Sequence, residues 1–529
     1  MPLAASERVE LPKGIVRARK GENIYIQYIV RAYRNEKGKP TNDRVCIGKL
    51  DQETGKLIPN ARYYELFEKR QPVGMPEYVR RCGSYAVLKG VAKQLGLYAM
   101  VKKHFSDCYD EIMTTAHFML CEGNVMYYLA DWQEETVSFS KEALNGTALS
   151  RLFTGIDSKR RIEFFNDWSK KKLTGEFLAY DVTSISSYSN GIESLEWGYN
   201  RDKEKLPQLN MGMYYGESSA LPLYYRLYPG SIPDKAHLRY MAEDTGIISC
   251  KKTKFVMDRG FYSAENLNYL TEKGCRFVIA LPGSLKYVKE LIKRHRNEIV
   301  NVSENMLGSG LPYGKKYETN ELGFRMNVHI YYDPVKALRD SENLYELIER
   351  EETELRNMEE PPERNLHYDK YFFINRSKDG KLGFVKNHKA IDEALSLCGF
   401  FVIVETDFKK TTAEILEIYR RRDVIEKSFD DLKNELDFKR ARTHSDQTLN
   451  GKVFVSFISL IVKSYMQNHT TGSNLTHKKL ILELDKIKIF DIHSNAKPKL
   501  LNPPTKTARE ILASLELNSE VVCDNFEGI

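Results

Sequence analysis

The feature that most constrains this chain is one charged, amphipathic segment, residues 411–436. Its sequence is TTAEILEIYRRRDVIEKSFDDLKNEL. Thr411 and Glu414 have the spacing of a capping box, so the sequence predicts that a helix begins there. Apolar residues recur along the segment at helical spacing and predict one buried stripe: Ile418, Ile425, Phe429, Leu432 and Leu436.

Four polar residues lie beside that stripe: Tyr419, Arg422, Glu426 and Lys433. At about 100° per residue they fall within an arc of roughly 60°, centred about 75° from the middle of the stripe. A strip at the edge of a buried face is where a helix points polar groups into a cleft. One carboxylate with two cations and a phenol suits a site that holds a metal ion and a phosphate together. For this segment alone, a surface helix rich in charge pairs is the alternative.

Length and composition are those of a globular protein. The chain has 529 residues, of which 42% are hydrophobic and 29% charged, and its net charge of +7 is compatible with a nucleic-acid partner. The eight cysteines form no C-x-x-C pair and no zinc spacing, which favours buried thiols in a reducing cytoplasm. The first residues have no apolar run, so we expect no signal peptide. The longest apolar run, residues 453–462, is too short to cross a membrane and predicts a core helix.

The pattern along the chain predicts a mixed α/β, multidomain fold in six regions. Residues 1–80 form a small, β-rich, basic N-terminal module, and residues 81–173 form a helical region. Residues 174–284 combine strands with helices, and residues 285–399 form an inserted, β-rich domain. Residues 400–470 return to a strand and the charged helix, and residues 471–529 form a helical tail.

Two basic regions are candidate DNA contacts. The small β unit, with strands predicted at residues 24–33 and 44–50, carries nine Lys and Arg side chains between residues 17 and 49, and either a DNA-contacting module or a solvated hairpin explains them. Residues 149–168 have helix–turn–helix proportions, with Arg160 and Arg161 at the start of the second helix. Helix pairs of this size are common, so ordinary packing is the alternative reading.

Three acids are notable for their positions. Asp181 lies inside the apolar run 177–186, and Asp258 directly follows the apolar run 254–257. Glu426 lies on the polar strip of the predicted helix. A carboxylate in or beside a buried strand is costly unless it is paired or binds metal. Three such carboxylates can hold two hard cations about 4 Å apart, and Mg²⁺ or Mn²⁺ suits all-oxygen ligands better than zinc. For each acid alone, a structural ion pair is the alternative.

Together these motifs resemble the DDE transposases of bacterial insertion sequences that carry the YREK signature. The matching segments are YDVTS around Asp181, MDRGFYS around Asp258, and Tyr-x2-Arg-x3-Glu-x6-Lys from residue 419, with all four positions present. The acids stand 77 and 168 residues apart, which suits the family. The turn at residues 228–234 also resembles the family's turn between the first two acids. The resemblance covers residues 177–462 and extends only loosely into the N-terminal region.

The resemblance implies a ribonuclease-H-like core interrupted by a β-rich insertion domain, preceded by DNA-binding regions. It implies a cut-and-paste DNA transposase that binds terminal inverted repeats and catalyses Mg-dependent phosphodiester hydrolysis and strand transfer. Such a protein acts on double-stranded transposon-end and target DNA as a homodimer, in the bacterial cytoplasm at the nucleoid and not at a membrane. Asp181, Asp258 and Glu426 would be catalytic and would bind two Mg²⁺ (or Mn²⁺) ions. The DNA-binding candidates are Tyr419, Arg422, Lys433, Arg259, Arg160 and Arg161.

The chain departs from the family in its tryptophans. Relatives can flip a base onto an aromatic residue of the insertion domain, but all three Trp residues here precede that region. The candidates for stacking are therefore Tyr368, Tyr371 or Phe372. Two other functions stay open: a non-catalytic DNA-binding protein descended from a transposase, and a glycoside hydrolase with two carboxylates. The hydrolase reading gives Arg422 and Lys433 no function.

Overall fold

The computed structural model spans the whole chain and divides it into two compact units. One unit comprises residues 1–86, 135–137 and 481–529, and the other comprises residues 87–134 and 138–480. The six regions predicted from the sequence are a finer division and stay a prediction. The structure describes residues 8–34, 38–67, 78–173, 175–244, 253–308, 312–358, 367–376, 382–473, 475–491 and 499–517.

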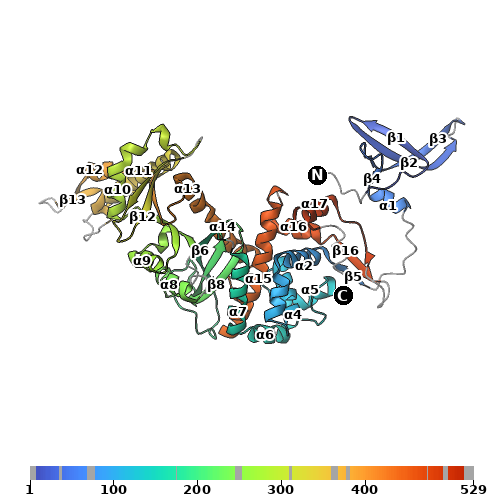
Figure 1. Ribbon diagram of the computed structural model, residues 1–529, viewed down its shortest axis with the longest axis horizontal. Helices are drawn as coiled ribbons and strands as arrows, with labels where there is room; N and C mark the ends of the chain where they lie inside the picture. Colours follow the sequence, from blue (N-terminus) through green and yellow to red (C-terminus); the bar gives the residue numbers. More distant parts are fainter. Residues whose placement is uncertain are drawn as a thin grey trace. The chain divides into compact units, whose positions relative to one another are not determined.

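The first unit contains two antiparallel sheets (Figure 1). The larger has the order β1 (Ile15–Lys20), β2 (Asn23–Arg34), β3 (Pro40–Leu50) and β4 (Leu57–Pro59), and helix α1 (Ala61–Phe67) contacts β3 and β4. Ile26, Ile47, Leu50 and Leu57 form its core. The sequence predicted β2 and β3 but missed β1, and it predicted only a turn where β4 lies. Part of the predicted turn between β2 and β3, residues 35–37, lies outside the described residues.

The second, three-stranded sheet of this unit joins segments from the two ends of the chain. β16 (Lys488–Asp491) pairs with both β5 (Tyr78–Arg81) and β17 (Lys499–Leu500). Helices α16 (His477–Leu484) and α17 (Lys506–Ser514) flank these strands in the sequence. The prediction of a purely helical C-terminal tail is therefore wrong, because β16 finds a strand partner some 400 residues away that periodicity cannot indicate.

Helices form the first part of the second unit. They are α2 (Gly83–Leu95), which crosses the boundary between the units, α3 (Leu97–His104), α4 (Tyr109–Glu122), α5 (Leu129–Glu135), α6 (Gly146–Gly155) and α7 (Ser158–Lys172). Helix α15 (Asp446–Thr470) packs against α4 and α6, and its buried face confirms the core helix predicted over residues 453–462. No helix in the described ranges is long and apolar enough to cross a membrane.

An eight-stranded mixed sheet dominates the second unit (Figure 1). Its order is β11 (Tyr313–Thr319), β12 (Met326–Tyr332), β15 (Phe400–Glu405), β10 (Arg276–Leu281), β9 (Lys254–Met257), β6 (Phe177–Ser186), β7 (Gln208–Gly216) and β8 (Pro222–Pro229). β6, β7 and β8 are antiparallel neighbours, whereas β9 and β10 run parallel to β6. Helices α8 (Asp234–Asp244) and α9 (Ala264–Glu272) follow β8 and β9 in the sequence. The predicted mixed α/β class is confirmed.

The inserted region differs from its prediction. Residues 285–399 contain α10 (Lys286–Ile299), β11, β12, α11 (Pro334–Asn357), β13 (Phe372–Arg376), β14 (Leu382–Lys386) and α12 (His388–Leu395). The described part has more helix than strand, so the prediction of a β-rich domain is wrong. Helix α11 begins at Pro334, where the Asp333 carboxylate caps it and Pro334 occupies its first position.

The cysteines also differ in part from expectation. Among the six described cysteines, Cys82 and Cys275 are buried and the other four are partly exposed. None of the six forms a disulfide. The prediction that most thiols are buried is therefore wrong for the described residues, whereas the absence of disulfides among them agrees with the sequence analysis.

Candidate active site

The charged helix is present but interrupted. Helix α13 (Thr412–Arg421) begins at the predicted capping box, in which the Thr411 hydroxyl and the Glu414 carboxylate each accept the other residue's backbone N–H. Helix α14 (Asp423–Asp430) follows after Arg422, and a π-helical turn, η6 (Asp431–Glu435), ends the segment. The predicted apolar stripe is buried. The single regular helix of the prediction is wrong, and such irregularities inside helices are frequent at functional sites.

Arg422 joins two of the three predicted acids. Its Nη1 lies 2.9 Å from Asp258 Oδ1, and its Nη2 lies 3.0 Å from Glu426 Oε1. The Tyr419 hydroxyl donates a hydrogen bond of 2.9 Å to the same Asp258 oxygen. The Arg422 side chain is 12% exposed, and its Nε is buried without a partner among the described residues. The guanidinium is thus a cation held between two carboxylates.

Asp181 and Asp258 occupy equivalent positions on adjacent parallel strands. Tyr180 of β6 pairs with Met257 of β9, and Asp181 and Asp258 directly follow these two residues. Side chains at the same level of neighbouring parallel strands point to the same face of a sheet. Helix α14, which carries Glu426, contacts β6. The elements therefore bring all three acids to one region of the sheet.

The pKa of Asp181 depends on burial and on the charged groups around it. Burial raises the pKa of Asp181 to about 6, although the Val182 N–H donates to its Oδ1 at 2.8 Å. The positive charges of Arg201 and Arg422 lower this pKa, and the Glu426 carboxylate raises it. Burial also disfavours the charge of Arg422, but its surroundings, which include all three acids, outweigh burial and raise its pKa.

The fourth residue of the polar strip has a separate partner. Lys433 lies in the π-helical turn and donates a hydrogen bond of 2.7 Å to Asp202 Oδ2, in the segment between β6 and β7. The expected arc of four residues assumed regular helical spacing, and the π turn breaks that spacing before Lys433. The structure therefore places Tyr419, Arg422 and Glu426 together and gives Lys433 a different contact.

Arg201 is a neighbour of the site that sequence reasoning missed. Its guanidinium pairs with Asp234, whose other oxygen accepts a hydrogen bond of 2.8 Å from the Tyr228 hydroxyl. Both partners belong to the turn at residues 228–234, so this turn helps to fix a cation whose charge acts on Asp181. Arg201 lies in an irregular segment, where no periodicity distinguishes one charged residue from the next.

The remaining predicted DNA-binding residues lie in two places. Arg259 directly follows Asp258, is exposed, and starts the short 3-10 turn η3 (Arg259–Phe261). Arg160 pairs with Asp157 at the start of α7 and with Asp107. Arg161 donates a hydrogen bond to Asn450. Arg160 thus contacts residues of the helical region and Arg161 contacts helix α15, and their part in DNA binding stays a prediction.

The aromatic residues proposed for base stacking are packed in a core. Tyr368, Tyr371 and Phe372 are buried together with apolar residues of α11 and α12. Their ring faces are therefore not available, and the prediction that one of them stacks a base is wrong for this structure. Phe373, one position further along β13, is the exposed aromatic residue instead, as the alternation of side chains along a strand requires.

The donors at the site suit a hard divalent cation, but their arrangement does not form a closed metal site. Three carboxylates supply only oxygen, the ligand that Mg²⁺ and Mn²⁺ prefer. Within the ranges that the structure describes, no three His, Cys, Asp or Glu side chains are grouped to hold a metal ion. In place of a metal ion, the Arg422 guanidinium pairs with oxygens of Asp258 and Glu426.

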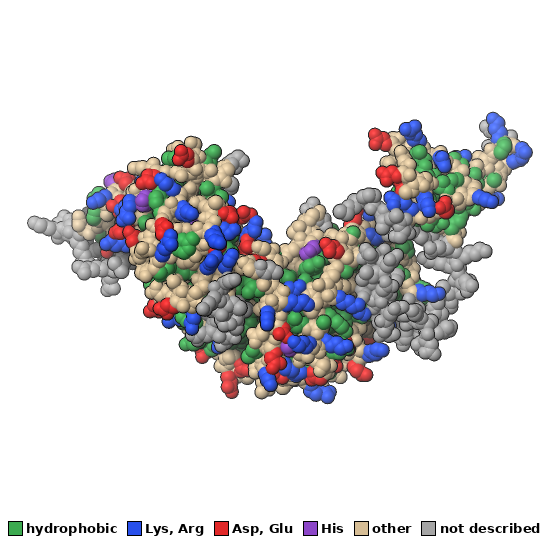
Figure 2. Space-filling model, viewed as in Figure 1, with side chains coloured by type: hydrophobic (Ala, Val, Ile, Leu, Met, Phe, Trp, Pro, Cys, Tyr) green, Lys and Arg blue, Asp and Glu red, His purple; other side chains and the backbone are tan. Residues whose placement is uncertain are grey.

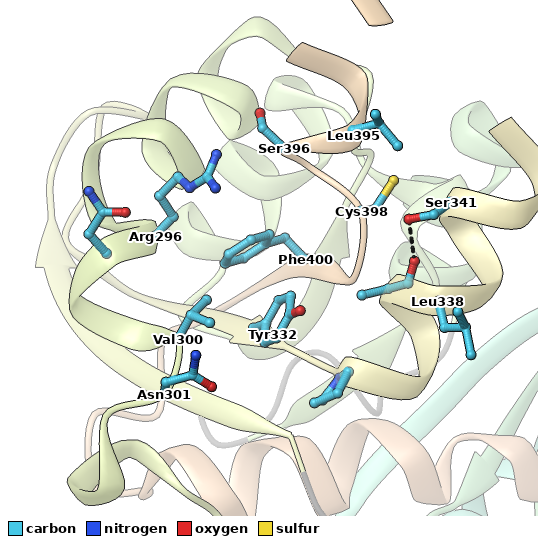
Figure 3. A pocket seen from close by; sticks show the side chains of 13 residues that line it. Arg296, Val300, Asn301, Tyr332, Leu338, Ser341, Leu395, Ser396, Cys398 and Phe400 are labelled. Atoms are coloured by element: carbon cyan, nitrogen blue, oxygen red, sulfur yellow. Dashed lines mark hydrogen bonds between the residues drawn. The ribbon is translucent and has the colours of Figure 1, made fainter. Parts of the chain in front are cut away.

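Two cavities in the described part of the chain are lined by residues other than the three acids. One, of about 620 Å³, is in the inserted region, where Arg296, Tyr332 and Phe400 are among the side chains around the hollow (Figure 3). The other, of about 820 Å³, is lined by residues 187–191 after β6 and by Arg440, Arg442, Thr443 and His444. On the face shown in Figure 2, basic and acidic side chains are interspersed over the described surface. The net positive charge is therefore not gathered into one large patch on that face.

The fold and site define a mixed α/β protein in which acids and cations cluster around Asp181, in the middle of β6, and Asp258, directly after the adjacent parallel strand β9. Residues 172–462 match the family described as "Transposase DDE domain". The match spans more than half of the chain, and the chain belongs to this family.

One solved structure shows a low similarity to this chain. A cryo-EM structure of a piggyBac transposase synaptic complex with hairpin DNA is 10% identical in sequence, with a TM-score of 0.34. The similarity covers 84% of this chain and 82% of that chain. No curated protein sequence matches.

Proposed function

We propose that the chain is a DNA transposase in which Asp181, Asp258 and Glu426 act together on a scissile phosphodiester. The observation that carries this proposal is the position of the acids. Asp181 and Asp258 lie at the same level of adjacent parallel strands, and Arg422 pairs with both Asp258 and Glu426. Clustered carboxylates of this kind are costly unless a cation compensates them. Membership of the transposase DDE family supports the same reading.

Each residue of the site has a proposed part. The three carboxylates would hold two Mg²⁺ (or Mn²⁺) ions, which activate a water or a 3′-hydroxyl and stabilise the leaving oxygen. Arg422 would exchange its carboxylate partners for a DNA phosphate, a ligand that suits its planar fork. Arg259 and Lys433 would contact further phosphates. Tyr419 orients Asp258 through its hydroxyl.

The strand order supports the finer family assignment. The order β8-β7-β6-β9-β10, with three antiparallel strands followed by two parallel ones, is compatible with the ribonuclease-H-like core that the family resemblance implies. The YREK spacing supports a bacterial insertion-sequence enzyme. The proposed activity is cut-and-paste transposition by a homodimer that binds terminal inverted repeats, in the cytoplasm at the nucleoid.

The test is cleavage of labelled duplex DNA taken from the two flanks of the coding sequence, with Mg²⁺ or with EDTA. We expect the wild-type chain to cut at the element end only with Mg²⁺. The Asp258→Ala variant should bind the same DNA and leave it intact. Equal cleavage by both proteins would remove the site assignment. Binding without cleavage by the wild type would instead favour the non-catalytic DNA-binding protein.

A further inference from the structure

Two cations that follow Glu426 along the chain are paired with acids of one short segment. Lys433 Nζ donates to Asp202 Oδ2 at 2.7 Å, and its side chain is only 10% exposed. The Arg440 guanidinium donates to both oxygens of Glu204, with Nη2–Oε1 at 2.9 Å. The pairing with Arg440 lowers the pKa of Glu204, so this carboxylate is ionised at neutral pH. Both cations are therefore neutralised within the chain itself.

The paired acids belong to residues 201–206, with the sequence RDKEKL, here called the 201–206 arm. Within it, Asp202 and Glu204 are half-buried, while Lys203 and Lys205 are exposed. A turn shapes the arm: the Asp202 N–H donates to the side-chain oxygen of Asn200, and Lys203 has a left-handed φ of 57°. That backbone conformation is disfavoured for a residue with a side chain. The arm is thus bent so that its acids face the core and its lysines face solvent.

Several side-chain donors hold the backbone that carries Arg440. The buried Lys452 ammonium donates to the carbonyls of Ala441 and Arg442 at 3.2 and 3.4 Å. Asn124 Nδ2 donates to the Arg440 carbonyl at 2.8 Å. Because these donors hold the carbonyls of Arg440 and of the two residues after it, we expect an incoming ligand to displace the arm rather than the cation.

The surface next to Arg440 has the chemistry of a nucleic-acid contact. The cavity of about 820 Å³ is lined by residues 187–191, which have the sequence SYSNG, together with Arg440 and Arg442. Tyr188 is 74% exposed, and the Arg440 guanidinium lies 5.2 Å from the centre of its ring. Cations and backbone N–H groups suit phosphates, and an exposed ring beside them suits a base.

We propose that Lys433 and Arg440 form the path of a DNA strand leaving the acid site, and that Asp202 and Glu204 occupy its phosphate positions until DNA displaces them. A carboxylate and a phosphate both accept from a guanidinium in the same bidentate geometry, so one can stand in for the other. This inference rests on the proposed function. The competing arrangement keeps the arm in place and runs DNA over its outer face, along Lys203 and Lys205.

Affinity for DNA distinguishes the two arrangements, because only displacement of the arm predicts that removing an acid of the arm tightens binding through the cation that it frees. The probe is a labelled duplex of mixed sequence in EDTA, since phosphate contacts need neither a specific sequence nor a metal ion. We expect Asp202→Asn and Glu204→Gln each to tighten binding by about fivefold, since each frees a cation for a phosphate. Glu193→Gln is the matched control: it removes one exposed acid of the β6–β7 segment for which the described residues provide no cation partner, and it should change affinity little.

A double-mutant cycle separates loss of the ion pair from a general change in charge. In a Lys433→Ala background, Asp202→Asn should no longer tighten binding. Unchanged or weaker binding by both acid variants, or the same gain with and without Lys433, would overturn the inference. If Lys433→Ala and Arg440→Ala leave affinity unchanged, the proposed DNA path itself fails. If those variants weaken binding but the acid variants do not tighten it, only the displaced arm is rejected and the proposed function stands.

Discussion

The surroundings of Asp181 disfavour its ionised form. Its pKa is raised to about 6 by burial, above the value of about 4 in an unfolded chain. The folded chain therefore binds this proton more tightly than the unfolded chain does. Stability must fall as pH rises from about 4 to about 6, and the loss persists at higher pH. A buried carboxylate that costs stability at neutral pH is what a site awaiting a cation should contain.

Asp181→Asn should accordingly stabilise the metal-free protein at neutral pH. We expect a gain of about 2 kcal/mol in the free energy of unfolding at pH 7.5 and almost none at pH 4, because the wild-type carboxyl is protonated there. Chemical denaturation in EDTA at both pH values measures this. A loss of stability at both would mean that the carboxylate makes a structural ion pair.

Arg422 competes with a metal ion for the same carboxylates. Its guanidinium contacts oxygens of Asp258 and Glu426, and both acids are partly solvated, so the pairs are worth only about 1 kcal/mol. Arg422→Ala should therefore raise the affinity of the DNA-free protein for Mn²⁺ by about fivefold. Electron paramagnetic resonance of Mn²⁺ titrations measures this. Weaker Mn²⁺ binding by the variant would show that Arg422 supports the site instead.

Among the structural elements, regular ones were predictable and irregular ones were not. Strand β6 and the strand before Asp258 have strong apolar patterns, so their acids could be placed from the sequence alone. Tyr419, Arg422 and Glu426 lie within α13, α14 or the junction between them, and their strip was predictable from a period of 3.6. Lys433 lies in a π turn, which cannot be recognised from a hydrophobic pattern with a period of 3.6 residues. Its partner Asp202 comes from a loop.

The loop after the π turn depends on one buried lysine of α15. Lys452 is 2% exposed, and its Nζ donates to three backbone carbonyls, those of Asn124, Ala441 and Arg442. Lys452→Met keeps the length of the side chain but leaves these acceptors unsatisfied, at a cost of about 2 kcal/mol. Denaturation at pH 8 should show this loss. Hydrogen exchange of residues 440–442 should become faster, and unchanged exchange would contradict the assigned role.

At the scale of the whole molecule, the inserted region is continuous with the main sheet. β12 pairs with β15, which returns the chain to the charged helix. Asn327 and His329 of β12 both contact the buried Glu405 carboxylate at the end of β15. The sequence indicated an interruption between residues 285 and 399, but its pattern does not reveal that two of the inserted strands extend the same sheet.

Removing the insertion should therefore damage the rest of its unit. A chain in which a short Gly/Ser linker replaces residues 285–399 would expose one edge of β15 and leave Glu405 without two of its partners. Exposed edges favour aggregation, and an unpaired buried carboxylate destabilises the fold. We expect this variant to aggregate or to lose cooperative unfolding in calorimetry. A soluble, cooperatively unfolding product would show that the insertion is an independent domain.

The central claim is that the carboxylates of Asp181, Asp258 and Glu426 converge on divalent cations when DNA is bound. The most direct measurement is anomalous diffraction from Mn²⁺ in crystals of the chain with element-end DNA. The account predicts Mn²⁺ peaks about 2.2 Å from oxygens of all three acids, with the Arg422 guanidinium moved from the acids to a phosphate. Mn²⁺ bound elsewhere, or Arg422 still between Asp258 and Glu426 in the DNA complex, would contradict it.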